Sequence, residues 1–109
     1  MTQAEFVFVY STFPDQGSAV HVAEALVKGR LAACVNIHSP MISVYEWDAK
    51  LQSTDEFAVF IKTRQALVPD VIAAARALHP YTVPCFLVLP ITSGNEDYLD
   101  WARAQTRAS

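Results

Sequence analysis

The chain has 109 residues, 52% of them hydrophobic, and a formal net charge of -3 at pH 7. This length predicts a single domain, spanning residues 1–109, that is large enough to bury a core. The eight lysines and arginines are scattered and form no basic stretch, so we expect no nucleic-acid partner. The sequence has neither a secretory signal pattern at its start nor the ~18 to 20 apolar residues of a membrane span, so we expect no membrane partner and a cytoplasmic location.

The first third of the chain predicts a strand followed by a helix. Residues 5–11 alternate aromatic and branched apolar side chains, which is typical of a strand that is apolar on both faces. Either Asp15 or Ser18 can cap the helix that follows. Apolar residues at spacings of three and four along residues 19–30 predict an amphipathic helix. Gly29 marks its end, because a glycine with positive φ commonly ends a helix.

A very long β-hairpin is predicted over Leu31–Thr63, with its tip at residues 47–50. Each arm has about a dozen residues, which at ~3.3 Å per residue span ~40 Å, whereas a compact domain of this length is ~35 Å across. The tip is therefore expected to project beyond its own domain. Proline has no N–H for strand pairing, so Ser39-Pro40 predicts a bulge or bend in the outgoing arm. Because exposed strands rich in Tyr, Trp and Ile aggregate unless a partner covers them, we expect self-association.

The last part of the chain predicts a helix, a strand and a further helix. Apolar residues recur with helical spacing over residues 68–78, Pro69 suits the first turn of a helix, and Pro80 ends it. Val83–Ile91 is apolar on both faces and predicts a strand. A short terminal helix is expected to begin at Asn95-Glu96-Asp97, because asparagine is a common N-cap and the two acidic side chains suit the positive end of a helix.

This order of elements, βαββαβ with an added C-terminal helix, is the ferredoxin-like pattern of the α+β class. Its four strands form one antiparallel sheet, and right-handed crossovers place the first two helices on the same face. The other face then lacks a cover, although three of the four strands carry large apolar residues on both sides. We therefore expect another copy of the chain to cover that face in a closed homo-oligomer.

Several motifs spread along the chain resemble one known family. They are LAACVNI at residues 31–37, S-x-Y-x-W at Ser43, Tyr45 and Trp47, Lys62-Thr63, His79-Pro80-Tyr81, Pro84, and G-x-x-x-Y-x-x-W at Gly94, Tyr98 and Trp101. Together they resemble the divalent-cation tolerance proteins called CutA, from about Val9 to Trp101. The resemblance implies a homotrimer similar to the PII signalling trimers, a link to tolerance of copper and other divalent metals, and no established catalytic reaction, so we expect no enzyme. We expect Tyr45 and Trp47 to contact a neighbouring subunit of this trimer.

The chain departs from the family pattern at two places. Relatives usually carry W-x-G-K at the hairpin tip, and here Ala49 replaces the glycine, so a turn that needs positive φ at this position would be strained. Relatives usually carry Pro-Glu where this chain has Pro84-Cys85. That glutamate is a proposed metal ligand in some members, together with a cysteine and a histidine whose corresponding positions here are Ser11 and Leu78.

Cys85 and His79 are the best pair of soft metal ligands in the sequence. Thiolate and imidazole groups suit copper or zinc, and a separation of six residues allows the two to meet across a helix-to-strand connection. A structural zinc site takes four ligands, so a neighbouring subunit or water would supply the others. The alternative is that Cys85 is a small buried apolar residue and that His79 ends the helix. The first hypothesis predicts copper or another divalent metal ion as cofactor, and the second predicts none.

A second candidate site is an inter-subunit cleft lined by Glu56, Lys62, Tyr81, Tyr98 and Trp101. Glu56 and Lys62 share a face of the returning strand because their separation is even. Buried charges need partners and aromatic tips supply polar groups, so such a cleft would bind a small anion or a partner protein, as a PII-like signalling or scaffold protein does. The alternative is a structural salt bridge with ordinary packing.

Overall fold

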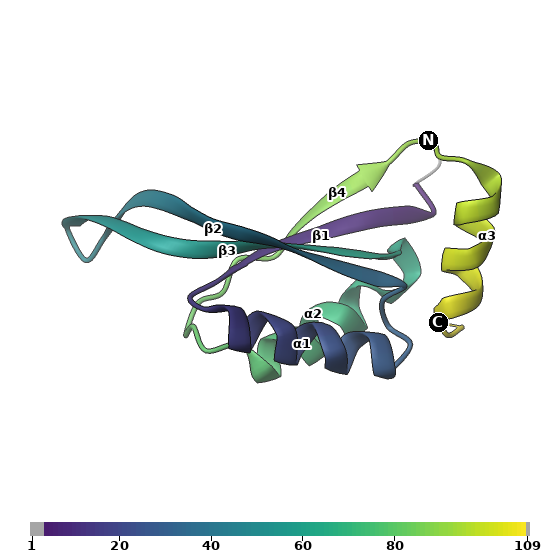
Figure 1. The fold of residues 1–109 in the computed structure, drawn as a ribbon, viewed down its shortest axis with the longest axis horizontal. Coiled ribbons are helices and arrows are strands. Elements are labelled where there is room, and N and C mark those ends of the chain that lie inside the picture. Colours follow the sequence, from purple (N-terminus) through teal and green to yellow (C-terminus); the bar gives the residue numbers. More distant parts are fainter. Residues whose placement is uncertain (1–3, 109) are drawn as a thin grey trace.

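The structure is a computed structural model and describes residues 4–108, so residues 1–3 and 109 of the predicted domain lie outside the described residues. Its elements are β1 (Phe6–Phe13), α1 (Gln16–Lys28), β2 (Cys34–Trp47), β3 (Lys50–Arg64), a 3₁₀ turn (Gln65–Leu67), α2 (Val68–Leu78), β4 (Leu87–Ile91) and α3 (Glu96–Gln105). The strands form one antiparallel sheet in the order β2-β3-β1-β4 (Figure 1). The predicted α+β class with a four-stranded antiparallel sheet is confirmed.

One face of the sheet packs against α1 and α2, which lie side by side beneath it (Figure 1). Side chains alternate between the two faces of a strand, so every second residue of β1 and β3 points toward these helices. The largest fully buried members of this core are Phe13, Leu26, Ile61 and Leu67. Each such side chain contributes about 1.5 to 3 kcal/mol when it leaves water.

The two ends of α1 are fixed by different devices. The carboxylate of Asp15 accepts a 2.7 Å hydrogen bond from the backbone N–H of Ser18, so Asp15 is the observed N-cap. At the other end Gly29 is the C-cap, as predicted, but the expected positive φ is not there: the φ of Gly29 is -77°, and the positive φ of 60° falls on Arg30. The backbone N–H of Leu31 closes this end with a 2.9 Å hydrogen bond to the last turn, which places the left-handed residue one position later than expected.

The predicted long hairpin is formed by β2 and β3, with Asp48 and Ala49 at its tip. It stretches the molecule to 45 × 30 × 23 Å, and its tip projects beyond the helices (Figure 1). The predicted interruption is present as a shift in strand register between Ile37 and Pro40. Trp47 near the tip is 60% exposed. The described chain therefore leaves its own hairpin tip largely uncovered.

Strand β4 is shorter than predicted. The sequence pattern suggested Val83–Ile91, whereas the strand begins at Leu87. Pro84 cannot donate a backbone hydrogen bond to a neighbouring strand. Residues 79–86 instead form a loop that crosses near the end of β1, where His79 is held to the backbone.

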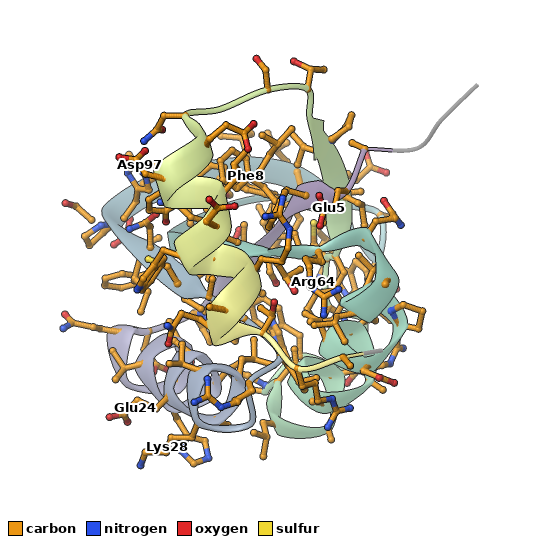
Figure 2. The ribbon with its side chains drawn as sticks, turned by 90° about the vertical axis from the view of Figure 1, so that its right-hand side faces the viewer. Glu5, Phe8, Glu24, Lys28, Arg64 and Asp97 are labelled. Atoms are coloured by element: carbon orange, nitrogen blue, oxygen red, sulfur yellow. The ribbon has the colours of Figure 1, made fainter. Side chains whose placement is uncertain are left out.

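Helix α3 covers only one end of the opposite sheet face. Its contacts there form a small cluster of Phe6, Ala33 and Ala102 with Ile91 and Leu99 at its border. Figure 2 looks onto α3, which stands across this end of the sheet while α1 and α2 lie below it. The remaining apolar residues of that face, which we call the open face, are Phe8, Tyr10, Phe60, Leu87 and Leu89. The predicted uncovered apolar face is thus confirmed for the described residues, except at the end that α3 covers.

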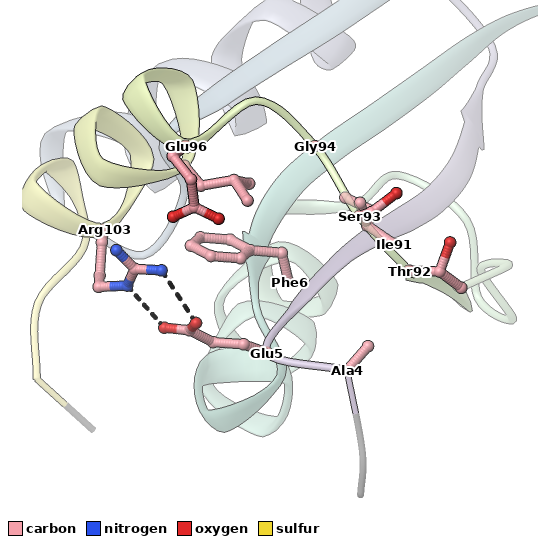
Figure 3. Close-up of a pocket in the computed structure, with 10 residues that line it drawn as sticks. Ala4, Glu5, Phe6, Ile91, Thr92, Ser93, Gly94, Glu96 and Arg103 are labelled. Atoms are coloured by element: carbon pink, nitrogen blue, oxygen red, sulfur yellow. Dashed lines mark hydrogen bonds and ion pairs between the residues drawn. The ribbon is translucent and has the colours of Figure 1, made fainter.

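Arg103 fixes α3 to the start of β1. Its guanidinium donates hydrogen bonds to both carboxylate oxygens of Glu5 at 2.8 and 3.0 Å (Figure 3), and it lies over the ring of Phe6, 5.2 Å from the ring centroid. The hydrogen bonds lower the pKa of Glu5 and raise the pKa of Arg103. Water screens this exposed pair, so it orients α3 more than it stabilises the fold.

The hairpin tip predicts a stabilising substitution. Asp48 and Ala49 have φ values of 54° and 62°, as in a type I′ turn, and the left-handed region costs a residue with a Cβ about 1 kcal/mol. We expect Ala49→Gly to raise the free energy of unfolding by about 0.5 to 1 kcal/mol, measured by urea denaturation. Ala73→Gly on the exposed side of α2 is the matched control and should lower it by about 0.5 to 1 kcal/mol. Equal losses in both variants would show that the turn is unstrained.

Candidate functional site

A hollow lies where the loop after α2 meets the projecting hairpin, at the margin of the open face. We call it the hairpin hollow, and it is lined by Thr12, Tyr45, Trp47, Glu56, Tyr81, Thr82, Val83 and Cys85. It brings together residues from all three groups that the sequence singled out: the predicted cleft, the predicted subunit contact and the predicted metal ligands. It is therefore the candidate site of this chain.

Strand alternation explains which side chains meet in the hairpin hollow. Tyr45 and Trp47 are two residues apart on β2 and so point to the same face. On β3, Glu56 pairs with Met41 and Gln52 pairs with Tyr45, which places Glu56 on that face as well. The loop that follows α2 forms the opposite wall. Two long strands and one loop thus bring together residues that are far apart in the sequence.

Glu56 and Tyr81 form the polar centre of the hollow. Glu56 is only 8% exposed and accepts a 2.7 Å hydrogen bond from the hydroxyl of Tyr81. Burial, and then the hydrogen bond to the carboxylate, raise the pKa of Tyr81, so its hydroxyl stays a neutral donor. The three ion pairs found within residues 4–108 do not include Glu56. Glu56 is thus a buried carboxylate whose partner in the described chain carries no charge.

His79 holds the loop in place with both of its ring nitrogens. Its Nε2–H donates to the carbonyl oxygen of Thr12 at 2.9 Å, and its Nδ1 accepts from the backbone N–H of Tyr81 at 3.1 Å. The neutral tautomer with a proton on Nε2 satisfies both contacts. The ring also stacks on Phe13 with the centroids 4.1 Å apart, and burial lowers the pKa of His79. In this conformation neither nitrogen is left to bind a metal.

Cys85 lines the hollow as a free, half-buried thiol. Burial, and then the nearby carboxylate of Glu56, raise its pKa, which disfavours the thiolate form that binds metals. Within residues 4–108 no group of three or more His, Cys, Asp and Glu side chains is arranged to hold a metal ion. The donors of one chain therefore do not fit a complete metal centre. The prediction that Cys85 and His79 bind a metal stays a prediction.

The residues of the predicted cleft form two separate groups within one chain. The Nζ of Lys62 lies 5.5 Å from the ring centroid of Tyr98, and this ring packs on Trp101 with the centroids 5.5 Å apart. Glu56 and Lys62 do share a face of β3, but six residues at ~3.3 Å each place them ~20 Å apart. They form no salt bridge with each other in the described chain. A cleft that joins the two groups across subunits stays a prediction.

Sequence reasoning missed Thr12, Thr82 and Val83, which also line the hollow. No motif marks them, because their place in the site depends on where the loop crosses β1. The carbonyl oxygen of Thr12, which accepts from His79, is a backbone group that every residue type would supply. The amino-acid sequence therefore gives no indication of this contact.

None of the helices within residues 4–108 has both the length and the apolar character needed to cross a membrane. The expectation that the chain is not an enzyme stays a prediction. The expected cytoplasmic location and the expected absence of a nucleic-acid partner also stay predictions.

Comparison with known proteins gives consistent matches along the chain. The family model described as "CutA1 divalent ion tolerance protein" matches residues 7–105. A divalent-cation tolerance protein CutA from Thermus thermophilus is 43% identical over 90% of this chain and 95% of its own length. Chloroplastic CutA from Arabidopsis thaliana is 43% identical over 93% of this chain, and human CutA is 39% identical over 91%. The chain spans little more than half of these two longer relatives, 56% and 55% of their lengths.

Solved structures show the same likeness in three dimensions. The divalent cation tolerance protein from Thermus thermophilus has a TM-score of 0.90 at 41% identity, covering 94% of this chain and 99% of its own. CutA1 from Oryza sativa has a TM-score of 0.94 at 38% identity, covering 100% of both chains. The projecting hairpin and the loop after α2 therefore belong to an architecture found in solved proteins of this size.

The burial of His79 predicts a stability loss in mild acid. Its pKa lies below the ordinary 6.5 in the folded chain, so the unfolded chain binds the proton more readily. The contribution of neutral His79 to the free energy of unfolding is therefore fully present above pH ~6.5. This contribution is lost as the pH falls from ~6.5 toward the lowered pKa of the folded chain. We expect the urea midpoint of the wild type to fall between pH 7 and pH 5, a range above the one in which Glu5 titrates.

His79→Gln should flatten this pH dependence, because the substituted side chain does not take up a proton. His21→Gln on the exposed side of α1 is the matched control and should keep it. A wild-type midpoint that stays constant from pH 7 to pH 5 would contradict the role assigned to His79.

Proposed function

Because the chain belongs to the CutA1 divalent ion tolerance protein family, we propose that it protects its cell against excess divalent metal ions, copper among them. The observation that carries this proposal is the match in both sequence and fold over nearly all of the chain. Relatives and solved structures that match it bear names of divalent cation tolerance. Tolerance is therefore the role in which this chain should first be tested.

The protein is proposed to act as a homotrimer of ferredoxin-like subunits, similar in architecture to PII trimers. The open face supports self-association, since Leu87 is 57% exposed and Leu89 is 42% exposed on a sheet that α1 and α2 cover from one side only. Each Å² of apolar surface that a second copy covers contributes about 25 cal/mol. Closed symmetry is the usual arrangement of homo-oligomers, and the family resemblance favours three copies.

Metal handling in this proposal does not depend on a complete metal centre inside one chain. Cys85 is the proposed soft ligand, and it shares the hairpin hollow with Tyr45 and Trp47, the two residues predicted to contact a neighbouring subunit. Three or four donors are usual for bound copper or zinc. A neighbouring subunit is therefore the proposed source of the donors that one chain lacks.

Assembly through the open face can be tested with one matched pair of substitutions. Leu89→Glu places a charge in the proposed contact, and burying an unpaired charge is costly, so association should weaken at least about tenfold. Val27→Glu on α1 is the control, because Val27 is 44% exposed and Leu89 is 42% exposed, yet Val27 lies outside the open face. Sedimentation at micromolar concentrations should show an assembly for wild type and Val27→Glu and smaller species for Leu89→Glu. A monomeric wild type would overturn the trimer.

The tolerance role predicts a growth phenotype. Cells without this protein should stop growing at lower copper or zinc concentrations than cells with it, and the full chain should restore growth. If a thiolate bond to the metal is part of the role, Cys85→Ala should fail to restore growth, whereas Cys34→Ala, which removes the other half-buried thiol, should succeed. Growth that is equally sensitive with and without the protein would contradict the proposed function.

A further inference from the structure

We propose that α3 is a lid over one end of the sheet and that residues 105–107, which we call the strap, hold this lid shut. The strap leaves the end of α3 and runs toward α1 and α2 (Figure 2), where groups from three distant parts of the chain bind it. Within residues 4–108, these groups belong neither to the open face nor to the hairpin hollow nor to the predicted cleft. The proposal goes beyond the tolerance role and does not depend on it.

Helix α3 has few apolar contacts of its own. Within the described helix Glu96–Gln105, Ala102 is the one buried residue, and Leu99 is partly buried. A helix of this length is marginal in water by itself, so tertiary contacts must hold it. The exposed pair of Arg103 and Glu5 is screened by water. Other polar contacts must therefore supply much of the attachment of α3.

Thr106 in the strap is the C-cap of α3 and is only 8% exposed. Its hydroxyl accepts a 2.9 Å hydrogen bond from the Nε–H of Arg64, the last residue of β3, and donates to the carbonyl oxygen of Ala102 at 3.1 Å. That carbonyl is one of the last four of the helix, which generally need a partner from outside the regular helical pattern. One threonine hydroxyl thus joins the end of α3 to the end of β3.

The strap is also bound from the side of the two long helices. The Nη1–H of Arg30 donates to the carbonyl oxygen of Gln105 at 3.1 Å, and the carbonyl oxygen of Arg30 accepts from the N–H of Arg107 at 2.8 Å. The guanidinium of Arg107 donates to Asp70 on α2 at 3.1 Å. Arg30 is the residue with the left-handed φ of 60°, a conformation that persists where the surroundings fix it. The strap holds this residue through its backbone and its side chain.

The charge of the groups around the strap suits its position. The C-terminal end of a helix carries partial negative charge and outward-pointing carbonyls, so cationic donors are favourable there. Arg30 and Arg64 are such donors. The planar guanidinium of Arg64 donates in two directions, to Thr106 and to the carbonyl oxygen of Arg107. These polar contacts can be lost together while the packing of α1 and α2 on the sheet remains.

Opening of the lid would change the surface of the chain and leave the main core intact. Phe6 and Ala33 are 6% and 7% exposed, and they form a small cluster with Ala102 that is separate from the main core. An open lid would add Phe6 and Ala33 to the apolar open face. The strap therefore controls how much apolar surface this end of the sheet presents.

Hydrogen exchange of the full-length protein measures this opening. Wild-type amides of α3 should exchange at least about tenfold faster than those of β1, because local opening needs less free energy than global unfolding. Thr106→Val keeps the branched shape and removes the hydroxyl, and Arg64→Met keeps an apolar stem and removes the donors. Each should speed exchange in α3 about a further tenfold and leave β1 unchanged.

Two further variants check that these effects belong to the strap. Arg76→Met is the matched control, because Arg76 lies on the exposed side of α2, outside the strap, and exchange in α3 should stay at the wild-type rate. The double variant of Thr106→Val and Arg64→Met should exceed the stronger single variant by no more than about twofold, because both changes remove the same link.

Four results would overturn the proposal. Wild-type exchange in α3 that is as slow as in β1 would show that the helix does not open separately. Unchanged exchange in both Thr106→Val and Arg64→Met would show that other contacts hold α3, a neighbouring subunit among them. Equal acceleration in α3 and β1 would show a loss of global stability, and equal acceleration in Arg76→Met would show that the strap has no special role.

Discussion

The structure depends on one imbalance: its sheet is apolar on both faces, and the chain supplies a full cover for one of them. Val7 and Val9 of β1 point toward α1 and α2 and are completely buried. Phe8 and Tyr10 alternate with these valines along the strand and point to the opposite face. Helix α3 shields one end of that second face and stops there. Large exposed apolar patches often mark interaction sites, and this surface is the observation behind the proposed self-association.

The loop between α2 and β4 forms one wall of the hairpin hollow, and the strands of the sheet form the other. His79 anchors the loop from below by bonding the backbone of β1, and its stacking on Phe13 ties it to the main core. The next turn of the loop then carries Tyr81 over the sheet to Glu56. One buried imidazole therefore links the stability of the core to the geometry of the hairpin hollow. The same contacts occupy both ring nitrogens of this histidine in the structure.

Electrostatics divides the described chain into three regions with different roles. The exposed arginines near the C-terminal end pair with Glu5, Asp70 and Asp100, and water screens these contacts. Lys62 rests on the ring of Tyr98 at one end of the open face. Glu56 at the other end is buried and has no cationic partner within residues 4–108. Water therefore screens the charge of Glu56 least, and the described chain compensates it least. A ligand or a second subunit that supplied a positive charge would gain the most interaction energy there.

The sequence by itself determined the order and type of the elements, because hydrophobic period, proline position and capping residues act over a few neighbouring residues. The interruption at Pro40 follows from such a local rule, and Asp15 is one of the two capping residues that the sequence allowed. The strain expected at Ala49 came from the resemblance to the family pattern, and the φ of Ala49 is indeed positive. The family could also be named from motifs spread along the chain. The tertiary structure alone decided that β4 starts at Leu87 and that the predicted cleft residues separate into two groups, since both depend on the path of a loop.

The same loop decided the chemistry of the site. Sequence placed Cys85 and His79 six residues apart, a spacing that permits a shared metal, but it could not show that backbone groups of Thr12 and Tyr81 occupy both imidazole nitrogens. Backbone carbonyls and amides leave no mark in a sequence, because every residue type carries a carbonyl and nearly every one an N–H. Local patterns therefore fixed which elements form, and only the packing of distant segments fixed which polar atoms remain free to bind a ligand.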